Sequence, residues 1–535
     1  MITSNDFTAT VKTNRWYLLI AIPAILAQLI IFKTGYPFAS YFFTDSFGYI
    51  YAAINNMDAG TWPVGYSKFL RVFNTFIHTD TGLVCFQYLF LQAAGLYFLF
   101  TLLHFFRPSR IIANVLFIFL VFNPVFLYLA NSVSSDALFI GGSFLWLSQL
   151  IRMIRRPSLR RSCLHAILLA LLFTFRYNAI YYYPLVSLLA ILLSSPARRI
   201  SPTGHITHLT RLAQKTLLSQ RAIAIALPAL LLLAFIYYTG NSVKQMTGTR
   251  KFSPFGGWQM ANNALYLVRN AHDLPPAPAR FAGLDSQIRH YFDTAKQERT
   301  LFDASYPGIY FLWSQQGPLA AYVNQQRKKD TTVPYFTSWT AASQQYTGYA
   351  TWLIGQHPAA FVQHFVWPNT IRYIFPPLEF MGRYNSNMDT VDQMAKFWFH
   401  YKSNRVKAFS KDFQAFLLAG FPILNLVTNL FFLLIVLLFA FTKSAWKITS
   451  VPAGHLPPPT SAVAQAPSSS PAFARYIAVV FALWLLHFAF SVVAAPVVLR
   501  YQVFLLTICL SFSLLIVEQL VRSDKTIKNI PTTTT

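Results

Sequence analysis

Four ionisable side chains lie beside or within long apolar stretches of this sequence: Asp45, Asp136, Arg176 and Arg500. A charge that enters a membrane helix is energetically expensive, so residues of this kind are functional-site hypotheses by default. A carboxylate at a partly buried, low-dielectric surface can accept a proton, and a guanidinium group can hold an anion. The four residues therefore predict proton-transfer or anion-binding chemistry close to a membrane face.

Each of these residues also has a structural interpretation. Asp45 and Asp136 both stand among Ser and Thr residues at the predicted start of a helix, where Asp is a favoured capping residue. Arg176 can pair with Asp136 or another carboxylate instead of binding phosphate. Arg500 precedes the last apolar run and can be an anchor at the membrane interface.

The composition indicates the setting of these residues. The chain of 535 residues is 55% apolar and only 11% charged, whereas soluble proteins carry about 25% charged residues. This places the chain among integral membrane proteins. The net charge of +26 is explained by Lys and Arg retained in cytoplasmic loops, so no nucleic-acid partner is expected. The three cysteines form neither a disulfide framework nor a metal-binding pattern.

Apolar runs of about 20 residues predict membrane-spanning helices. Eight runs fit directly: 16–32, 83–106, 111–130, 137–151, 222–239, 414–442, 476–495 and 502–520. A further run, 163–195, has basic segments on both flanks and Arg176 in its middle. Because short basic loops stay cytoplasmic, we expect this run to cross outward and return as two short helices. The prediction is an all-α polytopic membrane protein with about ten transmembrane helices and both termini inside.

This topology divides the chain into three parts. Residues 1–239 form an N-terminal transmembrane module, which includes a long first outer loop, 33–82. Residues 240–413 form a mainly helical non-cytoplasmic segment, and residues 414–535 form C-terminal helices joined by a Pro-, Ala- and Ser-rich cytoplasmic linker, 443–475. Only three of the 17 acidic residues fall in the proposed cytoplasmic parts: Asp6, Glu518 and Asp524.

Two short amphipathic helices are predicted in the first outer loop. The first covers 44–60, where apolar residues recur at helical spacing and Gly60 can end the helix. The second follows the turn Trp62-Pro63-Val64-Gly65-Tyr66 and carries Lys68 and Arg71 on its polar face. Helices of this kind are expected to lie on the membrane surface.

These motifs resemble the GT-C glycosyltransferases, such as protein O-mannosyltransferases and lipid A aminoarabinose transferases. The similarity rests on an acidic residue soon after the first span, a Tyr-x-x-Ala…Gly helix, a Pro-x-Gly-Tyr turn, and the motifs Asn131-Ser-Val-Ser-Ser-Asp136, Phe175-Arg176-Tyr177 and Arg500-Tyr501. It covers roughly the first 200 residues and the final hairpin. Many members place two acids together in this loop, whereas Ser46 follows Asp45 here. The sequence therefore leaves both a metal-assisted and a paired-carboxylate site open.

The resemblance implies an inverting glycosyltransferase that transfers a hexosyl or pentosyl group. The donor would be a polyprenyl-phosphate-linked sugar, and the acceptor a lipid, glycan or protein on the outer face of a bacterial inner membrane, in the periplasm. Asp45 and Asp136 are then the catalytic candidates. The candidates for substrate binding are Arg176, Tyr177, Arg500, Lys68, Arg71 and Tyr66. No cofactor or metal is indicated, and nothing names the sugar or the acceptor.

Other functions share parts of this pattern. A transporter or flippase should show repeated halves and polar groups near the membrane midplane, but no internal repeat is visible. A ligase or polymerase of surface polysaccharide would share the chemistry and differ in donor length. His104 and His487 lack partners at metal spacing and are interpreted as packing residues. Arg372-Tyr373 and Arg327-Lys328-Lys329 can contact the acceptor or lipid headgroups.

Overall fold

The computed structural model describes residues 4–155, 157–194, 208–270, 274–297, 308–442, 471–494 and 496–528. Over these ranges the chain is built from helices and contains no β-strand, apart from two isolated bridges. Eight helical stretches are long and apolar enough to cross a membrane. The predicted fold class, an all-α polytopic membrane protein, is therefore confirmed.

The eight stretches correspond to the eight predicted runs. They are α2 (Trp16–Gly35), α5 (Asp80–Phe106), α6 with α7 (Arg110–Val121 and Pro124–Ala130), α8 (Asp136–Arg155), α11 (His208–Thr247), α20 with α21 (Phe413–Leu418 and Phe421–Phe441), α23 (Pro471–Ala494) and α24 (Leu499–Lys528). Most of the expected linker, 443–470, lies outside the described residues. The helix α11 extends past the predicted boundary at residue 239.

The apolar run around Arg176 forms two short helical segments. These are α9 (Leu159–Phe175) and a continuous stretch made of η1 (Tyr177–Tyr181) and α10 (Tyr183–Leu192). Arg176 lies between them in an extended conformation, as the basic flanks predicted. Both segments are shorter than the eight long helices, so the total of ten crossings remains a prediction.

The helix α8 lies at the centre of the bundle, and nearly all of its residues are buried. A Cβ added to Gly141 would lie 2.7 Å from the Phe90 ring, and one added to Gly142 would lie 2.9 Å from the Leu172 side chain. Because small residues allow membrane helices to approach closely, these two glycines let α5 and α9 pack directly against α8. Asp136, the first residue of α8, is thereby held at the end of the best-packed helix.

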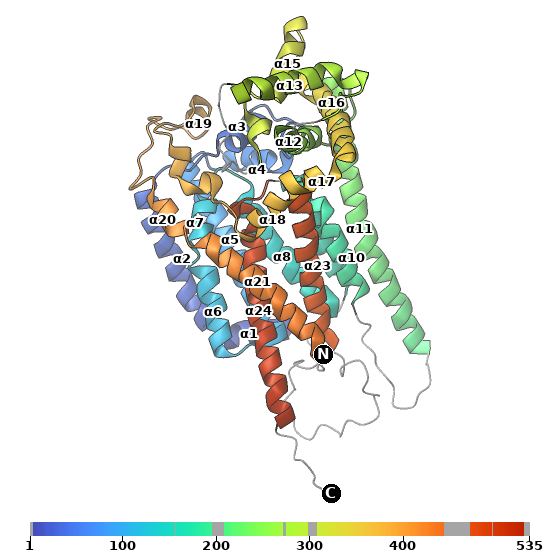
Figure 1. The fold of residues 1–535 in the computed structure, drawn as a ribbon. Coiled ribbons are helices and arrows are strands. Elements are labelled where there is room, and N and C mark those ends of the chain that lie inside the picture. Colours follow the sequence, from blue (N-terminus) through green and yellow to red (C-terminus); the bar gives the residue numbers. More distant parts are fainter. Residues whose placement is uncertain are drawn as a thin grey trace.

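A second layer of helices covers one end of the bundle (Figure 1). It comprises α12 (Phe255–Asn270), α13 (Ala282–Gln297), α14 (Tyr310–Trp313), α15 (Pro318–Lys329), α16 (Tyr335–Gln356), α17 (Pro358–Phe361), η3 (Val362–Val366), α18 (Trp367–Ile374), η4 (Glu379–Gly382), η5 (Tyr384–Asn387) and α19 (Gln393–Trp398). Its α12–α17 part has a hydrophobic core of its own, which includes Trp258, Leu265 and Tyr346. This layer corresponds to the predicted non-cytoplasmic segment.

The opposite end of the bundle carries α1 (Ser4–Thr13) and the C-terminal end of α24 (Figure 1). There the Arg152 guanidinium lies over the ring of Phe7, 4.2 Å from its centroid. His104 Nδ1 lies 2.8 Å from the hydroxyl oxygen of Thr10. His104 is thus a packing residue that fixes α1, as expected. The basic end of α8 lies on the same side as the N-terminal helix.

The first outer loop contains the two expected short helices, α3 (Phe43–Ile54) and α4 (Val64–Asn74). They pack against each other and lie beneath the outer layer (Figure 1). Two details differ from the prediction. The helix α3 ends at Ile54, so Gly60 lies beyond it, and its N-cap residue is Phe42, whose backbone N donates to the Ser46 hydroxyl at 2.8 Å. Asp45 lies inside the first turn, and the capping role considered for it is wrong.

Candidate functional site

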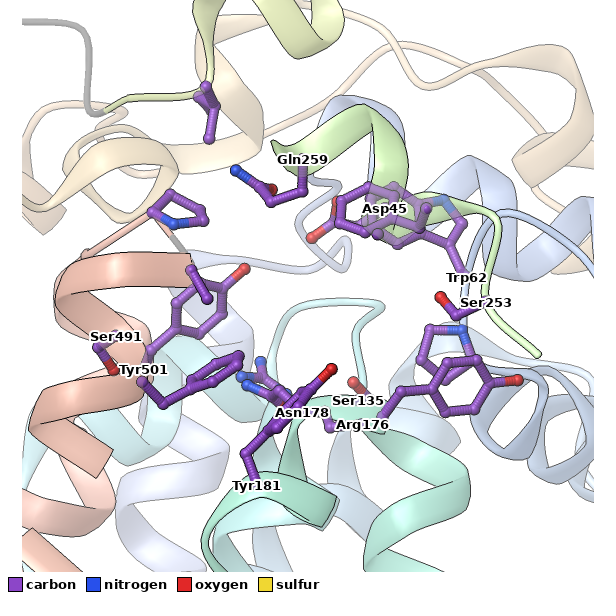
Figure 2. A pocket seen from close by; sticks show the side chains of 18 of the residues that line it. Asp45, Trp62, Ser135, Arg176, Asn178, Tyr181, Ser253, Gln259, Ser491 and Tyr501 are labelled. Atoms are coloured by element: carbon purple, nitrogen blue, oxygen red, sulfur yellow. The ribbon is translucent and has the colours of Figure 1, made fainter. Parts of the chain in front are cut away.

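A large cavity separates the membrane helices from the outer layer. Its volume is about 1020 Å³, and its walls come from α3, the start of α8, the turn between α9 and η1, α12, α23 and the start of α24. In Figure 2, Gln259 of α12 points into the cavity from one side, and Arg176 and Ser135 lie on the other. The cavity has the size of a site for a small ligand.

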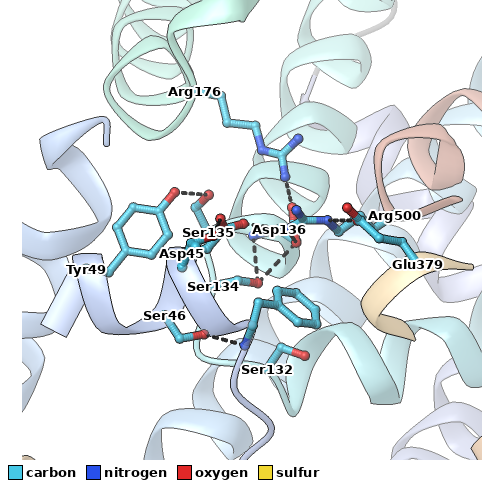
Figure 3. A network of polar contacts seen from close by, with 12 residues as sticks. Asp45, Ser46, Tyr49, Ser132, Ser134, Ser135, Asp136, Arg176, Glu379 and Arg500 are labelled. Atoms are coloured by element: carbon cyan, nitrogen blue, oxygen red, sulfur yellow. Dashed lines mark hydrogen bonds and ion pairs between the residues drawn. The ribbon is translucent and has the colours of Figure 1, made fainter. Parts of the chain in front are cut away.

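Five charged side chains form a cluster in the wall of this cavity (Figure 3). Arg500 is its centre. Its Nη1 donates to Asp45 Oδ2 at 2.8 Å and lies 3.4 Å from Asp136 Oδ2, and its Nε lies 3.4 Å from Glu379 Oε2. Arg176 pairs through Nη2 with the other oxygen of Asp136. Asp136 therefore joins the two guanidinium groups.

Five separate segments bring the cluster together. Asp45 comes from α3, Asp136 from the first residue of α8, Arg176 from the turn after α9, Glu379 from η4 and Arg500 from the first turn of α24. The tight approach of neighbouring segments fixes the Arg176 turn. At Gly65, α4 approaches the C-terminal end of α9 closely, because a Cβ added to Gly65 would lie 2.6 Å from the carbonyl oxygen of Thr174.

Aromatic rings enclose the two guanidinium groups. The Arg500 guanidinium lies 4.8 Å from the Phe42 ring centroid and 4.6 Å from that of Tyr501. The Arg176 guanidinium lies 4.4 Å from the Tyr501 centroid, on the same ring. Cation–π contacts within about 6 Å stabilise desolvated guanidinium groups. Tyr501 therefore contacts both cations.

The cluster is buried and carries an excess of negative charge. Asp136 is 1% exposed, Arg500 6% and Asp45 8%. Three carboxylates face two guanidinium groups, so the cluster has a net charge of −1 when all five residues are ionised. Removing one member of a buried ion pair leaves an uncompensated charge and is strongly destabilising. The five side chains must therefore be considered as one unit.

Burial shifts the ionisation of groups at the outer side of the cavity. The pKa of Glu379 is raised from 4.5 to about 7, mainly by burial, with the Asp45 charge adding to the rise and Arg500 opposing it. Burial also raises the pKa of Tyr49, and its hydroxyl oxygen lies 3.3 Å from that of Ser135. Burial lowers the pKa of Lys251, a further cavity-lining residue, whose Nζ donates to the Ser343 hydroxyl at 3.1 Å.

The structure brings together five of the eight predicted site residues. Asp45, Asp136, Arg176, Tyr177 and Arg500 all line the cavity. The considered pairing of Arg176 with Asp136 is present. A site built from the first outer loop, the fourth and fifth predicted spans and the last span therefore exists as a spatial unit.

The other three predicted residues lie away from the cavity lining. Lys68 Nζ pairs with Asp58 Oδ1 at 2.6 Å. Arg71 Nη1 donates to the two carbonyls at the C-terminal end of α3, at 3.0 and 3.2 Å. Tyr66 is fully buried and donates to Gln87 Oε1 at 2.8 Å. These three residues hold α3, α4 and α5 together and do not contribute to the cavity wall.

Several cavity residues were not among the predicted site residues. Glu379, Lys251, Gln259 and Trp62 are examples. The one available hint for Glu379 was its place directly after Pro376-Pro377-Leu378, in a chain with only three glutamates. His487 also lines the cavity, although it packs as expected, with Nδ1 3.1 Å from the Tyr373 hydroxyl.

Two other basic groups of the outer layer have structural partners. Arg372 Nη1 donates to Asn369 Oδ1 at 3.4 Å, and Arg327 lies over the Tyr335 ring at the end of α15. In the part of the chain that the structure describes, no group of three or more His, Cys, Asp or Glu residues is arranged to hold a metal ion.

Part of the chain is similar to a known family of membrane proteins. Residues 53–283 match a family model described as "Predicted membrane protein (DUF2142)". The match covers less than half of the chain, and includes Asp136 and Arg176 but not Asp45, Glu379 or Arg500. No curated protein and no solved structure matches the chain. The chain is therefore similar to a family of membrane proteins whose description names no activity, in agreement with its multi-pass helical fold.

Proposed function

We propose that this chain is an inverting glycosyltransferase of the GT-C type, which moves a sugar from a polyprenyl-phosphate donor to a lipid, glycan or protein acceptor. The observation that carries the proposal is the cluster of Asp45, Asp136, Arg176 and Arg500 in the wall of one cavity, at the end of the bundle that bears the outer layer. In a bacterial inner membrane this end would face the periplasm.

The proposed reaction is a direct displacement at the anomeric carbon. The acceptor hydroxyl oxygen forms a bond to this carbon, while the bond from the carbon to the donor phosphate oxygen breaks. The electron pair leaves with the polyprenyl phosphate, and the acceptor proton moves to a carboxylate. The reaction needs a general base for the acceptor and cations for the leaving phosphate. The cluster contains both kinds of group.

The two aspartates receive different roles because their surroundings differ. Asp136 is the most buried member and contacts both guanidinium groups. We assign it the positioning of Arg176 and Arg500. Asp45 of α3 has one cationic partner, and its other carboxylate oxygen accepts from the Thr44 hydroxyl at 3.2 Å, so it is the proposed base. A donor phosphate that contacts Arg500 would compete with Asp45 and release its carboxylate to accept the proton.

A lipid donor requires an opening between the cavity and the bilayer. Tyr181 of η1 and Val493 of α23 both line the cavity and are 58% and 48% exposed. The Tyr181 ring stacks on Phe490, with centroids 4.7 Å apart. Val493 lies at the end of a span, at the level expected for the membrane interface. We place the entry of the prenyl chain at this apolar part of the cavity wall.

The test uses the full chain in lipid nanodiscs with a panel of polyprenyl-phosphate-linked hexoses and pentoses. Release of polyprenyl phosphate is measured for wild type, Asp45→Asn and the matched control Asp58→Asn, which changes an exposed aspartate outside the cavity. We expect one donor to be consumed by wild type and by the control. Failure of wild type to consume any donor in the panel would contradict the proposed function.

A further inference from the structure

Glu379 is a buried carboxyl in the cavity wall to which the proposed reaction gives no part. Its Oε2 lies 3.4 Å from Arg500 Nε. Among the described residues, both of these atoms lack a hydrogen-bond partner, although both are buried. A buried polar atom without a partner is costly. The pair is thus a charge contact without hydrogen-bond geometry, and Arg500 retains a free donor beside the cavity.

The backbone holds Glu379 at this place. Its φ of 51° lies in the left-handed region, which is unusual for a residue other than glycine. The segment before it is anchored, because Leu499 N donates to the carbonyl oxygen of Pro377 at 2.9 Å, next to Arg500. Strained residues persist where the surrounding structure fixes them, and they cluster at functional sites. The position of the Glu379 carboxyl is therefore imposed by its surroundings.

Charge balance shows why this carboxyl matters for an anionic ligand. The cluster already has a net charge of −1 when fully ionised, and an anion bound at Arg500 would add to it. Uptake of one proton would restore the original charge. Asp45 accepts a hydrogen bond from Arg500, and Asp136 contacts two guanidinium groups, whereas Glu379 has one contact without hydrogen-bond geometry. Glu379 is therefore the carboxylate that loses least when it is protonated.

The charged and titratable groups around Glu379 are Arg500 and Tyr501 of α24, Asp45 of α3 and, through the two guanidinium groups, Asp136 and Arg176. On its other side, η4 packs against α20 and η5. The charged residues there, Arg383 and Asp412, face each other at 3.7 Å and are exposed. No described cation other than Arg500 thus contacts the Glu379 carboxylate.

We propose that Glu379 takes up one proton when an anionic group binds at Arg500, so that ligand binding in this cavity is coupled to proton uptake. This inference rests on the anion-binding half of the proposed function. Once protonated, Glu379 no longer repels the anion. Glu379 is a positioning residue, since it acts through Arg500 and through the charge of the cluster.

The ionisation of Glu379 supports this coupling. Because its pKa is about 7 in the free protein and an added anion raises it further, uptake should occur at and above pH 7. For one linked proton, the affinity should fall by about tenfold for each pH unit in the window between the free and the bound pKa. Below about pH 6 Glu379 is already protonated, so the affinity should become independent of pH.

The test is titration calorimetry of the full chain in nanodiscs with farnesyl methyl phosphate. This phosphodiester carries one negative charge across the whole pH range, so any proton taken up must bind to the protein. Binding is measured at pH 7.5 in two buffers of different ionisation enthalpy. Farnesol serves as the neutral probe. Because about a quarter of Glu379 is already protonated at pH 7.5 when its pKa is about 7, we expect up to about 0.75 proton to be taken up with the phosphodiester and none with farnesol.

Variants identify the group that takes up the proton. Glu379→Gln should bind the phosphodiester without proton uptake and with a flat pH dependence, whereas Asp412→Asn, an exposed control near η4, should behave as wild type. Wild-type binding without proton uptake would overturn the inference whatever the variant does, and so would uptake that persists in Glu379→Gln. Absence of binding at every pH would also overturn it. If wild type consumes a donor but takes up no proton when the phosphodiester binds, only the inference about Glu379 is refuted, and the proposed function stands.

Discussion

Arg500 and Asp45 lie 455 positions apart in the chain, yet Arg500 Nη1 donates to Asp45 Oδ2 at 2.8 Å in the wall of the cavity. The contact joins the first outer loop to the first turn of the last helix. Glu379, also on Arg500, ties the outer layer to the same guanidinium. One arginine thus connects the three parts of the chain, and its removal should have consequences for both folding and binding.

Arg500→Gln should therefore destabilise the protein and abolish binding of farnesyl methyl phosphate. The change leaves three buried carboxylates with Arg176 as their remaining guanidinium partner, and loss of one partner of a buried pair costs about 3–5 kcal/mol. The measurement is the thermal unfolding midpoint together with binding of farnesyl methyl phosphate. Arg522→Gln, at the other end of α24, is the control. An Arg500→Gln protein with unchanged midpoint and affinity would be incompatible with a central role for this residue.

Asp136→Asn and Asp45→Asn should differ in their effect on stability. Asp136 is the carboxylate that pairs with Arg176 and also contacts Arg500, so we expect its neutralisation to cost about 3 kcal/mol. Asp45→Asn removes one of three negative charges that face two cations and leaves Arg500 with two carboxylate contacts, so it should cost less than Asp136→Asn. Unfolding midpoints in one nanodisc preparation decide this. Equal destabilisation by the two substitutions would remove the distinction between a positioning and a reacting aspartate.

Gly65→Ala tests how the Arg176 turn is held. A Cβ at residue 65 would press on the backbone of Thr174 at 2.6 Å, and forced overpacking costs about 1–3 kcal/mol. Because small displacements of binding groups reduce turnover strongly, donor consumption should fall by about tenfold or more. Gly60→Ala, where an added Cβ meets no described atom within 4 Å, should be neutral. Matching activities of the two variants would show that the turn tolerates displacement.

The stability of the protein should depend on pH through Glu379. A carboxyl whose folded-state pKa is raised from 4.5 to about 7 contributes stability that is present below pH 4.5 and lost as the pH rises through 7. Glu379→Gln should thus be more stable than wild type at pH 8, by up to about 3 kcal/mol, and nearly equal to it at pH 4.5. Unfolding midpoints at the two pH values test this. If Glu379→Gln is less stable than wild type at pH 8, burial of the ionised Glu379 carboxylate does not destabilise the protein, and the prediction is wrong.

The sequence predicted the membrane-spanning part of the fold well, because about 20 apolar residues in a row have few other structures available. It also predicted the turn at Arg176, since basic flanks on both sides forced the run to leave and return. Apolar run length and basic flanks do not predict the structure of the outer layer. Its helices pack around a separate core, and short amphipathic segments do not reveal which partners they face.

The candidate site was predictable only in part for the same reason. Asp45, Asp136, Arg176 and Arg500 are recognisable because each charge interrupts or borders apolar sequence. Glu379 stands in a short apolar stretch that is interrupted by Pro376 and Pro377 and is too short to span a membrane, and only the fold places it beside Arg500. The polar face of α4 illustrates the reverse case. Lys68 and Arg71 looked available for phosphate, but tertiary packing directs them to Asp58 and to the carbonyl end of α3.

The most direct test of the central claim compares wild type, Asp45→Asn and Asp58→Asn in the donor-consumption assay. Asn has nearly the size of Asp but cannot accept the acceptor proton. If Asp45 is the general base, Asp45→Asn should fold as wild type does and lose about 10²–10⁴-fold in rate, with Asp58→Asn unaffected. A folded Asp45→Asn protein that turns over the donor at the wild-type rate would contradict the account.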